Sequence, residues 1–486
     1  MAKYDDSNAK GIESYAKFAV GKSFIEIFDG NSNTHNYSDF NKELNSQTNK
    51  GSLGQIVEKY YFGIKNNSEQ MPDFPNAGVE LKVCPYVVNK NGTISAKERL
   101  IITLINYMEV INEVFEKSHA YSKMSNILLM EYKHDYSMEK ADYTIDYAGL
   151  MRIPEKDLII IKKDFEFIVN KIREGNAHLL SEADTTYLGA CTKGSSAQSV
   201  RKQPNSNILA KQRAFALKSS YMTYFLRNIF FKENKNSIAE KQEIAEPIIK
   251  NVKEAENFES FVKEKIMKYK GKSIEEISNL FGVEKIDAKN RNSILTFRML
   301  GIKSNKAEEF EKANIVVKTI RLENDDSIEQ DMSFKNFKFT EVVKENVWEE
   351  SELYKLWSSV KFLFVVFKTN DDKKSKNKRY CLYDSQFWNI PEKDLDTYAQ
   401  DMWLKLKETI NNGIKTINKN GKTYNNLPKK SDNYMCHVRP KGTDSNDKYP
   451  LPNGGEFTKQ CYWLNKSYIK SQLECTKKGF SNENNC

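Results

Sequence analysis

The chain has 486 residues, of which 29% are charged and 12% aromatic, and its formal net charge is +9. This length allows two to four domains, and the basic excess suits either a nucleic-acid ligand or an ordinary basic surface. No apolar run approaches the roughly 20 residues of a membrane span, no signal-peptide core opens the sequence, and the seven cysteines form no Cys-x-x-Cys pair, so we expect a cytoplasmic protein without a zinc site.

The first half of the chain predicts a mixed α/β domain. A helix is expected over Lys50–Gly63, ending at the glycine. The segments Val79–Val88, Ser125–His134 and Ala141–Met151 have the pattern of strands. Pro154 then opens a helix that runs to about Gly175. Strands that alternate with helices are typical of α/β domains.

Segments of the first half recur in the second half at a nearly constant spacing. Asp73–Lys82 (DFPNAGVELK) aligns with Glu309–Lys318 (EFEKANIVVK), 236 residues later. The hexapeptide Ile153–Leu158 (IPEKDL) returns as Ile390–Leu395, 237 residues later. Such a period is too long for a solenoid and predicts two similar domains. We expect them over residues 1–228 and 267–486, with a helical connector over 229–266.

The first copy combines two acids with a lysine. Side chains two apart on a strand share a face, so Glu80 and Lys82 point the same way, and Asp73 can reach the same point across a short loop. Paired carboxylates suit Mg²⁺, and a lysine beside such an ion can orient or deprotonate a water that attacks phosphorus. Glu58, on the preceding helix, can add another carboxylate. Taken alone, this pattern fits a solvated, charged strand edge equally well.

Two motifs together resemble the MutH family: Lys-Gly-x-x-Gly-x-x-x-Glu ending at Glu58, and Pro72–Lys82 downstream. That family comprises the mismatch-repair nicking endonuclease and the Sau-type type II restriction endonucleases that cut at GATC. The resemblance implies the PD-(D/E)xK nuclease fold, Mg²⁺-dependent hydrolysis at 5′-GATC-3′, and a companion DNA methyltransferase that is not physically bound. It also implies that Asp73, Glu80 and Glu58 hold the metal and that Lys82 completes the catalytic set.

The family's base-reading Arg-Pro-Lys loop is matched in the second copy by Arg439–Lys441. In the first copy the equivalent stretch is Cys191–Lys193, which keeps only the lysine. The aromatic-Leu-Lys-Lys segment that follows in the family is echoed at Phe215–Tyr221 and Tyr462–Tyr468, although these aromatic residues equally suit a core. The residues expected to contact DNA are therefore Lys193, Lys218, Arg439, Lys441, Trp463 and Lys466.

The second copy has lost part of the catalytic set. It opens with Lys270–Gly282, an echo of Lys50–Gly63 that puts Ser278 near the position of Glu58. Val316 replaces Glu80, which removes a principal ligand. We therefore expect a degenerate domain that binds DNA, at GATC, without cutting it and acts allosterically.

These expectations describe a type II restriction endonuclease for double-stranded DNA containing GATC, with two tandem PD-(D/E)xK domains, the second degenerate. One active centre hydrolyses one strand, so a double-strand break requires two chains to pair on DNA or repeated visits. Two alternatives are a GATC strand-nicking mismatch-repair endonuclease and a catalytically dead DNA-binding regulator.

Overall fold

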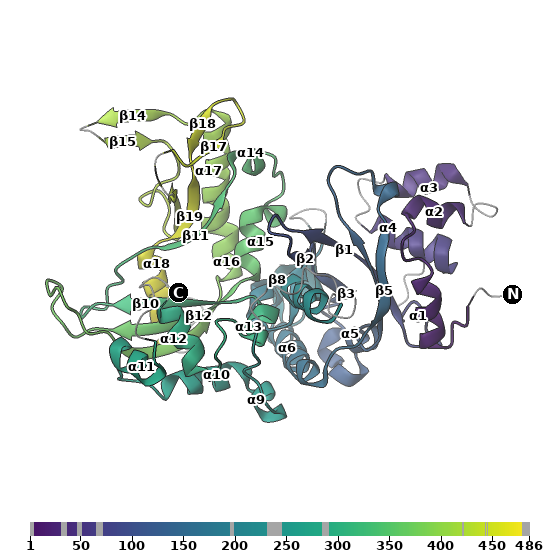
Figure 1. Ribbon diagram of the computed structural model, residues 1–486, viewed down its shortest axis with the longest axis horizontal. Coiled ribbons are helices and arrows are strands. Elements are labelled where there is room, and N and C mark those ends of the chain that lie inside the picture. The colour runs from purple at the N-terminus through teal and green to yellow at the C-terminus, as the bar shows by residue number, and fades with distance from the viewer. Residues whose placement is uncertain are drawn as a thin grey trace. The chain divides into compact units, whose positions relative to one another are not determined.

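A computed structural model describes residues 4–30, 36–45, 51–64, 71–194, 199–230, 245–283, 291–419, 422–442, 444 and 446–478. The chain forms two compact units. Unit 1 comprises Met1–Phe258 and Lys306–Asn314, and unit 2 comprises Glu259–Asn305 and Ile315–Cys486. In Figure 1 unit 1 is mostly purple to teal, and unit 2 is mostly green to yellow. Residues 245–258 and 306–314 thus lie outside the 1–228 range expected for the first domain but belong to its unit.

Unit 1 is built on a mixed sheet with strand order β2-β1-β4-β5. Strands β1 (Glu80–Val88) and β4 (Ile127–Lys133) run parallel, while β2 (Ile94–Ala96) and β5 (Ile145–Met151) pair antiparallel at the two edges. Helical segments pack a shared aromatic core against one face of this sheet. They are α1 (Ala9–Lys17), α2 (Phe24–Asp29), α3 (Tyr37–Leu44), α4 (Ser52–Ile56) and the π-helix η2 (Val57–Phe62).

A second, antiparallel sheet of unit 1 has the order β3-β9-β6. Its strands are β3 (Leu100–Leu104), β9 (Arg213–Leu217) and β6 (Leu188–Thr192), and the hairpin β7 (Val200–Gln203) and β8 (Ser206–Lys211) joins β6 to β9. Phe165 of the long helix α6 (Glu155–Arg173) stacks on Phe215 of β9. The other helices are α5 (His119–Met124), α7 (Ser219–Phe225), η8 (Leu226–Phe230) and α9 (Val252–Glu256), with short turns η3 (Val110–Asn112), η4 (Phe115–Lys117), η5 (Lys140–Asp142), η6 (Ala177–Leu179) and η7 (Glu182–Asp184).

Unit 2 contains the sheets β10-β12-β13 and β11-β19-β16. The first joins β10 (Ile315–Leu322) in parallel to β12 (Lys361–Lys368), which pairs antiparallel with β13 (Cys381–Trp388). The second is antiparallel, with β11 (Met332–Phe337), β19 (Gln460–Leu464) and β16 (Cys436–Pro440). Two hairpins, β14 (Thr416–Lys419) with β15 (Lys422–Asn425) and β17 (Lys448–Pro450) with β18 (Glu456–Thr458), extend this unit.

Helices of unit 2 enclose a core rich in tryptophan, which includes Trp357, Trp388 and Trp403. The helical segments are α10 (Phe258–Met267), α11 (Ile274–Phe281), α12 (Arg291–Met299), α14 (Phe339–Val342), η10 (Trp348–Glu350), α15 (Glu352–Ser359), α16 (Glu392–Asp394), η11 (Leu395–Ala399), α17 (Gln400–Asn411) and α18 (Lys466–Lys478). Of the expected connector 229–266, residues 252–256 and 258–266 are helical, whereas 231–244 lie outside the described residues.

The two units share one strand topology. In each, a parallel pair is followed by an antiparallel third strand, as β1-β4-β5 and as β10-β12-β13. In each, a three-stranded antiparallel sheet has its central strand last in the chain, as β3-β9-β6 and as β11-β19-β16. The hairpins also have equivalent places along the chain: β7-β8 lies between β6 and β9, and β17-β18 lies between β16 and β19.

The helix α11 corresponds to α2 rather than to the helix of Glu58, so the match of Ser278 with Glu58 is wrong. Gly21 and Gly271 both adopt positive φ and donate their amides to Ile145 and Leu382, at the start of β5 and β13. A serine–glutamate capping box then starts α2 and α11 alike. The tripeptide Gly-Lys-Ser occurs at both turns, as residues 21–23 and 271–273. It therefore aligns Lys270–Gly282 with the turn before α2 and not with the Lys50–Gly63 helix.

In unit 2, Thr296 of α12 has the same spacing to a glycine as Glu58 has in unit 1. Glu58 lies five residues before Gly63, and Thr296 lies five residues before Gly301; both glycines have positive φ after a helix. Thr296 is fully buried and its hydroxyl donates to the carbonyl of Asn292. Unit 2 therefore has no carboxylate at this position either.

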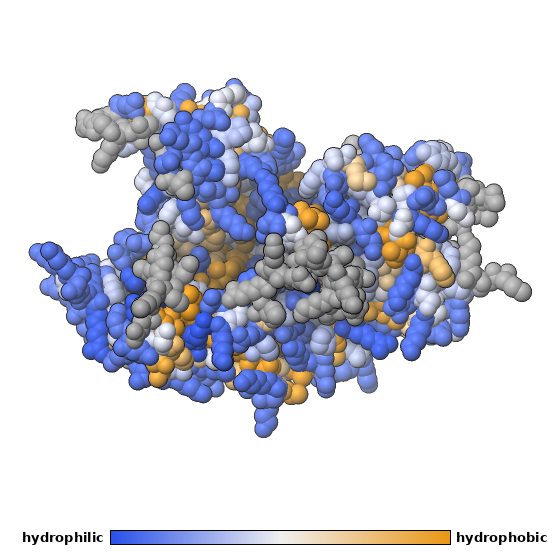
Figure 2. Space-filling model, viewed as in Figure 1, coloured by the Kyte–Doolittle hydropathy of each residue, from blue (hydrophilic) through white to orange (hydrophobic). Residues whose placement is uncertain are grey.

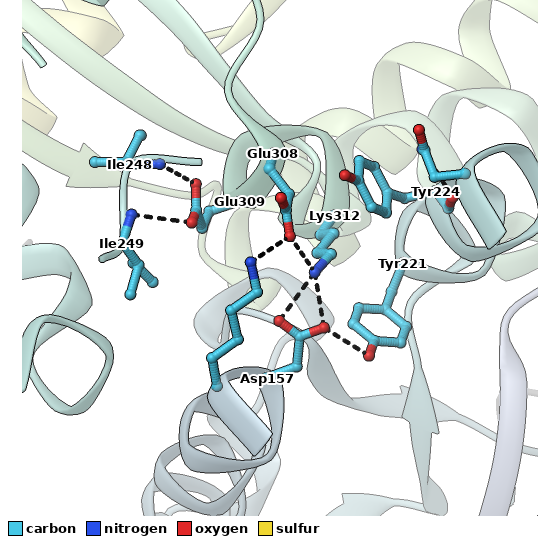
Figure 3. Close-up of polar contacts among 10 residues, drawn as sticks. Asp157, Tyr221, Tyr224, Ile248, Ile249, Glu308, Glu309 and Lys312 are labelled. Carbon is cyan, nitrogen blue, oxygen red and sulfur yellow. Dashed lines mark hydrogen bonds and ion pairs between the residues drawn. The ribbon is translucent and has the colours of Figure 1, made fainter. Parts of the chain in front are cut away.

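The short helix α13 (Glu308–Ala313) belongs to unit 1, although β10 of unit 2 follows it directly. Its Lys312 ammonium donates to both carboxylate oxygens of Asp157 (2.9 and 2.7 Å) and to Glu308 (2.7 Å). Tyr221 donates its hydroxyl to Asp157 from α7 (3.0 Å), as Figure 3 shows. This buried polar network fixes residues 306–314 to α6 and α7.

No helix in the described part of the chain is both long and apolar enough to span a membrane. On the face shown in Figure 2 hydrophilic residues predominate, and the apolar ones are scattered among them. That distribution agrees with the 29% of charged residues in the sequence.

Candidate active site

A tight turn brings Asp73 back beside strand β1. Phe74 and Val79 exchange backbone hydrogen bonds of 2.9 and 3.2 Å, and Gly78 between them has a φ of 62°, a conformation that favours glycine. The buried ring of Phe74 anchors the turn in the core. As a result, the carboxylate of Asp73 accepts the amide of Leu81 at 2.9 Å.

Glu80 is the first residue of β1, and its side chain is almost completely buried. Lys82, two residues along the strand, donates to its Oε1 at 2.7 Å. Lys123 donates to both oxygens, at 3.2 and 3.3 Å. Lys123 lies on α5, immediately before β4, so the parallel pairing of β1 with β4 brings it to Glu80.

Glu58 approaches the same acids from the π-helix η2, a distortion that is frequent at functional sites. The pKa of Glu58 is raised to about 7, first by burial and then by the charges of Asp73 and Glu80, while Lys82 and Lys123 act in the opposite direction. Burial and the charge of Glu80 also raise the pKa of Asp73. The three carboxylates are therefore close enough to repel one another.

The donor set of this site fits a hard divalent cation. The described residues contain no ready-made cluster of three or more His, Cys, Asp or Glu side chains that could hold a metal ion. However, Glu58, Asp73 and Glu80 supply carboxylate oxygens, and burial, with a smaller contribution from the neighbouring carboxylates, raises the pKa values of Glu58 and Asp73. A cation entering here would compete with Lys82 and Lys123 for Glu80.

Unit 2 has the opposite charge balance at the corresponding strand. Val316 stands in the place of Glu80 and is 37% exposed. Glu309, aligned with Asp73, accepts the amides of Ile248 and Ile249 at 2.9 and 3.1 Å within unit 1 (Figure 3). The lysine aligned with Lys82 is present as Lys318. Burial, together with the charge of the neighbouring Lys441, lowers the pKa of Lys318.

The expected DNA contacts of unit 1 divide into one exposed and one buried lysine. Lys193 follows β6 and is exposed, with its amide bonded to Gln212. Lys218 is 1% exposed and donates to the carbonyl of Thr185 at 2.5 Å inside the fold. The expectation that Lys218 faces DNA therefore does not fit this structure, because its ammonium ends on a buried carbonyl that needs a donor.

The expected contacts of unit 2 gather around Asp331. The exposed guanidinium of Arg439 lies 4.7 Å from the ring centre of Trp463, whose indole donates to the Arg439 carbonyl at 3.3 Å. Lys466 donates its backbone amide to the carboxylate of Asp331 at 2.8 Å and its ammonium to the backbone carbonyl of Glu329 at 3.2 Å. Lys441 donates to Ser333 at 3.1 Å and to the carbonyl of Phe334 at 2.6 Å.

The strand registers align the two candidate reading loops. Cys191 pairs with Ala214 on β9, as Arg439 pairs with Cys461 on β19, three residues before the strand end in both cases. Lys193 and Lys441 both donate their amides back to the segment before that central strand. Lys193 thus occupies the place of Lys441, and Cys191 that of Arg439.

The model of the family described as DNA mismatch repair enzyme MutH matches residues 62–164. The type II restriction enzyme Sau3AI of Staphylococcus aureus is 35% identical over 507 aligned positions, which cover 96% of this chain and 98% of that enzyme. This chain belongs to the MutH/Sau3AI family of endonucleases. The DNA mismatch repair protein MutH of Shewanella woodyi is 28% identical, and that of Vibrio vulnificus is 24% identical; each match covers 38% of this chain and 80 to 82% of the relative.

Membership in the MutH/Sau3AI family confirms the expected enzyme class: the chain is a type II restriction endonuclease, a site-specific deoxyribonuclease. The segment matched by the MutH model contains Asp73, Glu80, Lys82 and Lys123, and Glu58 lies just before it. Sequence reasoning missed Lys123. Its only local signal was a lysine on a helix directly before a strand, and nothing in that signal named Glu80 as its partner.

Proposed function

We propose that unit 1 hydrolyses phosphodiester bonds of double-stranded DNA at 5′-GATC-3′ with Mg²⁺ as its metal ion. The supporting observation is the group formed by Glu80, which Lys82 and Lys123 contact, and the carboxylates of Asp73 and Glu58, whose pKa values are raised. Asp73, Glu80 and Glu58 hold the ion. When bound, Mg²⁺ offsets the charge of the phosphate and lowers the pKa of a coordinated water.

The remaining roles follow from the contacts of each side chain. Lys82 orients the attacking water, because its ammonium lies beside Glu80 on the same strand. Lys123 keeps Glu80 in place by contacting both its oxygens. Without a metal ion the pKa of Glu58 is about 7, so near neutral pH Mg²⁺ competes with a proton for this carboxylate.

We propose that unit 2 is a degenerate copy of the same PD-(D/E)xK domain, with domain ranges close to 1–228, 229–266 and 267–486. The common strand topology and the aligned registers of β6-β9 and β16-β19 support this origin. Val316 and Thr296 in place of Glu80 and Glu58 support the loss of cutting. Exposed Arg439 and Lys441, with Trp463 and Lys466 nearby, support binding of a second GATC site, since arginine and lysine suit guanine O6 and N7.

A single centre per chain has a consequence for the assembly on DNA. One centre breaks one strand, so a double-strand cut requires two chains on the same site or two successive events. We propose that two chains pair on DNA, with the unit 2 sites holding another GATC copy as an allosteric effector. Cleavage of a two-site plasmid should then exceed that of a one-site plasmid, and equal rates, linear in enzyme, would exclude this assembly.

The cellular setting follows from the enzyme class. An enzyme that cuts GATC must coexist with host DNA in which those sites are protected. We propose that it acts in the cytoplasm beside a DNA methyltransferase of the same specificity, which is not physically bound to it. Methylation of GATC in a plasmid should block cutting.

A strand-nicking repair function is the second candidate, because the mismatch-repair relatives share the segment that holds Asp73, Glu80 and Lys82. Their match covers only 38% of this chain, whereas that of the restriction enzyme covers 96%, which favours the restriction enzyme. A dead regulator is disfavoured by the complete acid set of unit 1.

Incubation of the full chain with supercoiled GATC plasmid and Mg²⁺ separates these functions. Linear fragments support the restriction enzyme, open circles the nickase, and a mobility shift without cutting the regulator. Sequencing of the product ends tests GATC directly, and ends at another sequence would overturn that specificity.

Two variants test the catalytic set. Asp73→Ala and Glu80→Ala should each lower the cleavage rate at least 100-fold, because each removes a proposed metal ligand, while DNA binding through lysine–phosphate contacts persists. Glu139→Ala, which removes an exposed acid immediately before η5, is the matched control and should cut like the wild type. Full cleavage by Glu80→Ala would refute the assignment.

A further inference from the structure

The lysine of the second strand motif lacks the partner that its counterpart has. In unit 1, Lys82 contacts Glu80 at 2.7 Å. In unit 2, the ammonium of Lys318 lies 5.9 Å from the ring centre of Phe334, and no acid within the described residues acts on its pKa. Val316, two residues before it, supplies no charge.

A second ammonium approaches the same aromatic residue. Lys441, from the loop after β16, donates to the carbonyl of Phe334 at 2.6 Å and to Ser333 at 3.1 Å. Phe334 therefore touches both lysines, one through its ring and one through its carbonyl. Burial first, and then the charge of Lys441, lower the pKa of Lys318, so two cations repel each other across a partly buried place.

The other acids of the unit 1 site offer no compensation. Thr296 stands in the position of Glu58. Glu309, aligned with Asp73, is 2% exposed and uses both carboxylate oxygens on the amides of Ile248 and Ile249 inside unit 1 (Figure 3). The site of unit 1 thus combines three acids with two lysines, whereas the corresponding place in unit 2 combines two lysines with neutral residues.

Lys318 is partly buried and Lys441 is exposed, and an anion bound between their two ammonium groups relieves the repulsion between them. In a deoxyribonuclease that anion is a phosphate of the DNA backbone. We propose that Lys318 and Lys441 bind one phosphodiester oxyanion directly, in the role that a divalent cation has in unit 1. This inference rests on the proposed DNA binding by unit 2 and adds that this binding needs no metal ion.

The two centres then respond to metal in opposite ways. The three acids of unit 1 repel a phosphate until a cation neutralises them, whereas the lysines of unit 2 attract it at once. The full chain can therefore hold DNA through unit 2 before unit 1 is loaded with metal.

The test measures binding of the full chain to a fluorescent GATC duplex and to a scrambled duplex, in EDTA and in Ca²⁺, over a series of salt concentrations. All proteins carry Asp73→Ala so that no DNA is cut. Lys318→Met should weaken binding in EDTA to both duplexes by the same factor and reduce the salt slope by about 0.9, the value for one lost phosphate contact. Lys335→Met, an exposed lysine on β11, is the control and should change neither.

A second pair of variants reintroduces the missing acid. Val316 is partly exposed, so glutamate or glutamine fits there without disturbing the core. Val316→Glu should weaken binding in EDTA relative to Val316→Gln, because the new carboxylate neutralises Lys318 as Glu80 does Lys82. Ca²⁺ should remove this difference by restoring the binding of Val316→Glu.

The outcomes separate this inference from the proposed function. Arg439→Ala should weaken GATC binding in EDTA, and if it does not, DNA binding by unit 2 is refuted together with the inference. If Arg439→Ala weakens binding but Lys318→Met leaves affinity and salt slope unchanged, only the phosphate site is overturned. Equal affinities of Val316→Glu and Val316→Gln in EDTA would overturn it as well.

Discussion

Replacement of Lys312 by methionine tests the buried network that joins residues 306–314 to α6 and α7. Lys312 is 4% exposed and directs its ammonium to Asp157 and Glu308 at 2.7 to 2.9 Å. It also lies 5.0 Å from the ring centre of Tyr224. Methionine keeps the length of the side chain but removes the charge, so Asp157 is left buried with only the hydroxyl of Tyr221.

The size of the effect follows from what each acid keeps. Removal of one member of a buried ion pair costs about 3–5 kcal/mol, because the other charge stays desolvated. Glu308 retains Lys156 at 2.7 Å and Asp157 retains Tyr221, so we expect the lower end, about 3 kcal/mol, for Lys312→Met. The double variant Asp157→Asn/Lys312→Met removes both charges and should cost about 1 kcal/mol. Lys156→Met removes a 40% exposed lysine and should cost less than about 1 kcal/mol.

Hydrogen–deuterium exchange of the full chain measures this locally, since global unfolding of a two-unit protein is not a two-state process. In Lys312→Met, the amides of α6, α7 and residues 306–314 should lose about 3 kcal/mol of opening free energy, and the double variant should recover most of it. Wild-type exchange in the single variant, or equal losses in single and double variants, would refute the reasoning.

Four further changes test the site. Lys123→Met should lower the single-turnover cleavage rate more than DNA affinity, because the ammonium of Lys123 is bonded to Glu80; equal losses of both would contradict this role. The pKa of Glu58 is raised in the folded protein, so the stability of the metal-free protein should fall as the pH rises from the pKa of Glu58 in the unfolded chain through about 7. Ca²⁺ should therefore raise the melting temperature more at pH 8 than at pH 5.5. Gly78→Ala should lose about 1 kcal/mol of stability and part of the cleavage rate, whereas Gly78→Asn should keep more of both, as measured by urea titration and plasmid cutting. Lys218→Met should reduce thermal stability without a change in the salt slope of DNA binding, and a reduced slope would return this residue to the DNA interface.

Local patterns carried much of the fold. Alternation and β-branched residues located β1, β4 and β5 within a few residues, and Pro154 marked the start of α6. The predicted helix Lys50–Gly63 is present as α4 and η2, although no local pattern indicates that its second half is a π-helix. The alternation of apolar and polar residues and the placement of proline depend on only a few neighbouring residues, so they can be recognised without knowledge of the tertiary structure.

Features that depend on distant residues were not predictable. A lysine is usually exposed, so Lys218 suggested a DNA contact, yet the carbonyl of Thr185 captures its ammonium. The segment that begins at Gly271 can be aligned by sequence with the one at Gly21 or the one at Gly51. The backbone hydrogen bonds of Gly21 to Ile145 and of Gly271 to Leu382 identify Gly21 as the counterpart. Glu309 aligns with Asp73 in the sequence, but its carboxylate accepts the amides of Ile248 and Ile249. The spacing of the motif residues does not predict these hydrogen bonds.

The chain order of unit 1 constrains how the protein is made. The last segment of unit 1, Lys306–Asn314, is synthesised after residues 259–305 of unit 2. Unit 1 is therefore incomplete until translation has passed residue 314. At ordinary translation speeds the stretch from residue 228 to residue 314 takes on the order of ten seconds. Throughout that interval Asp157 lacks the ammonium of Lys312, and a nuclease shortened to its first 228 residues would lack it permanently.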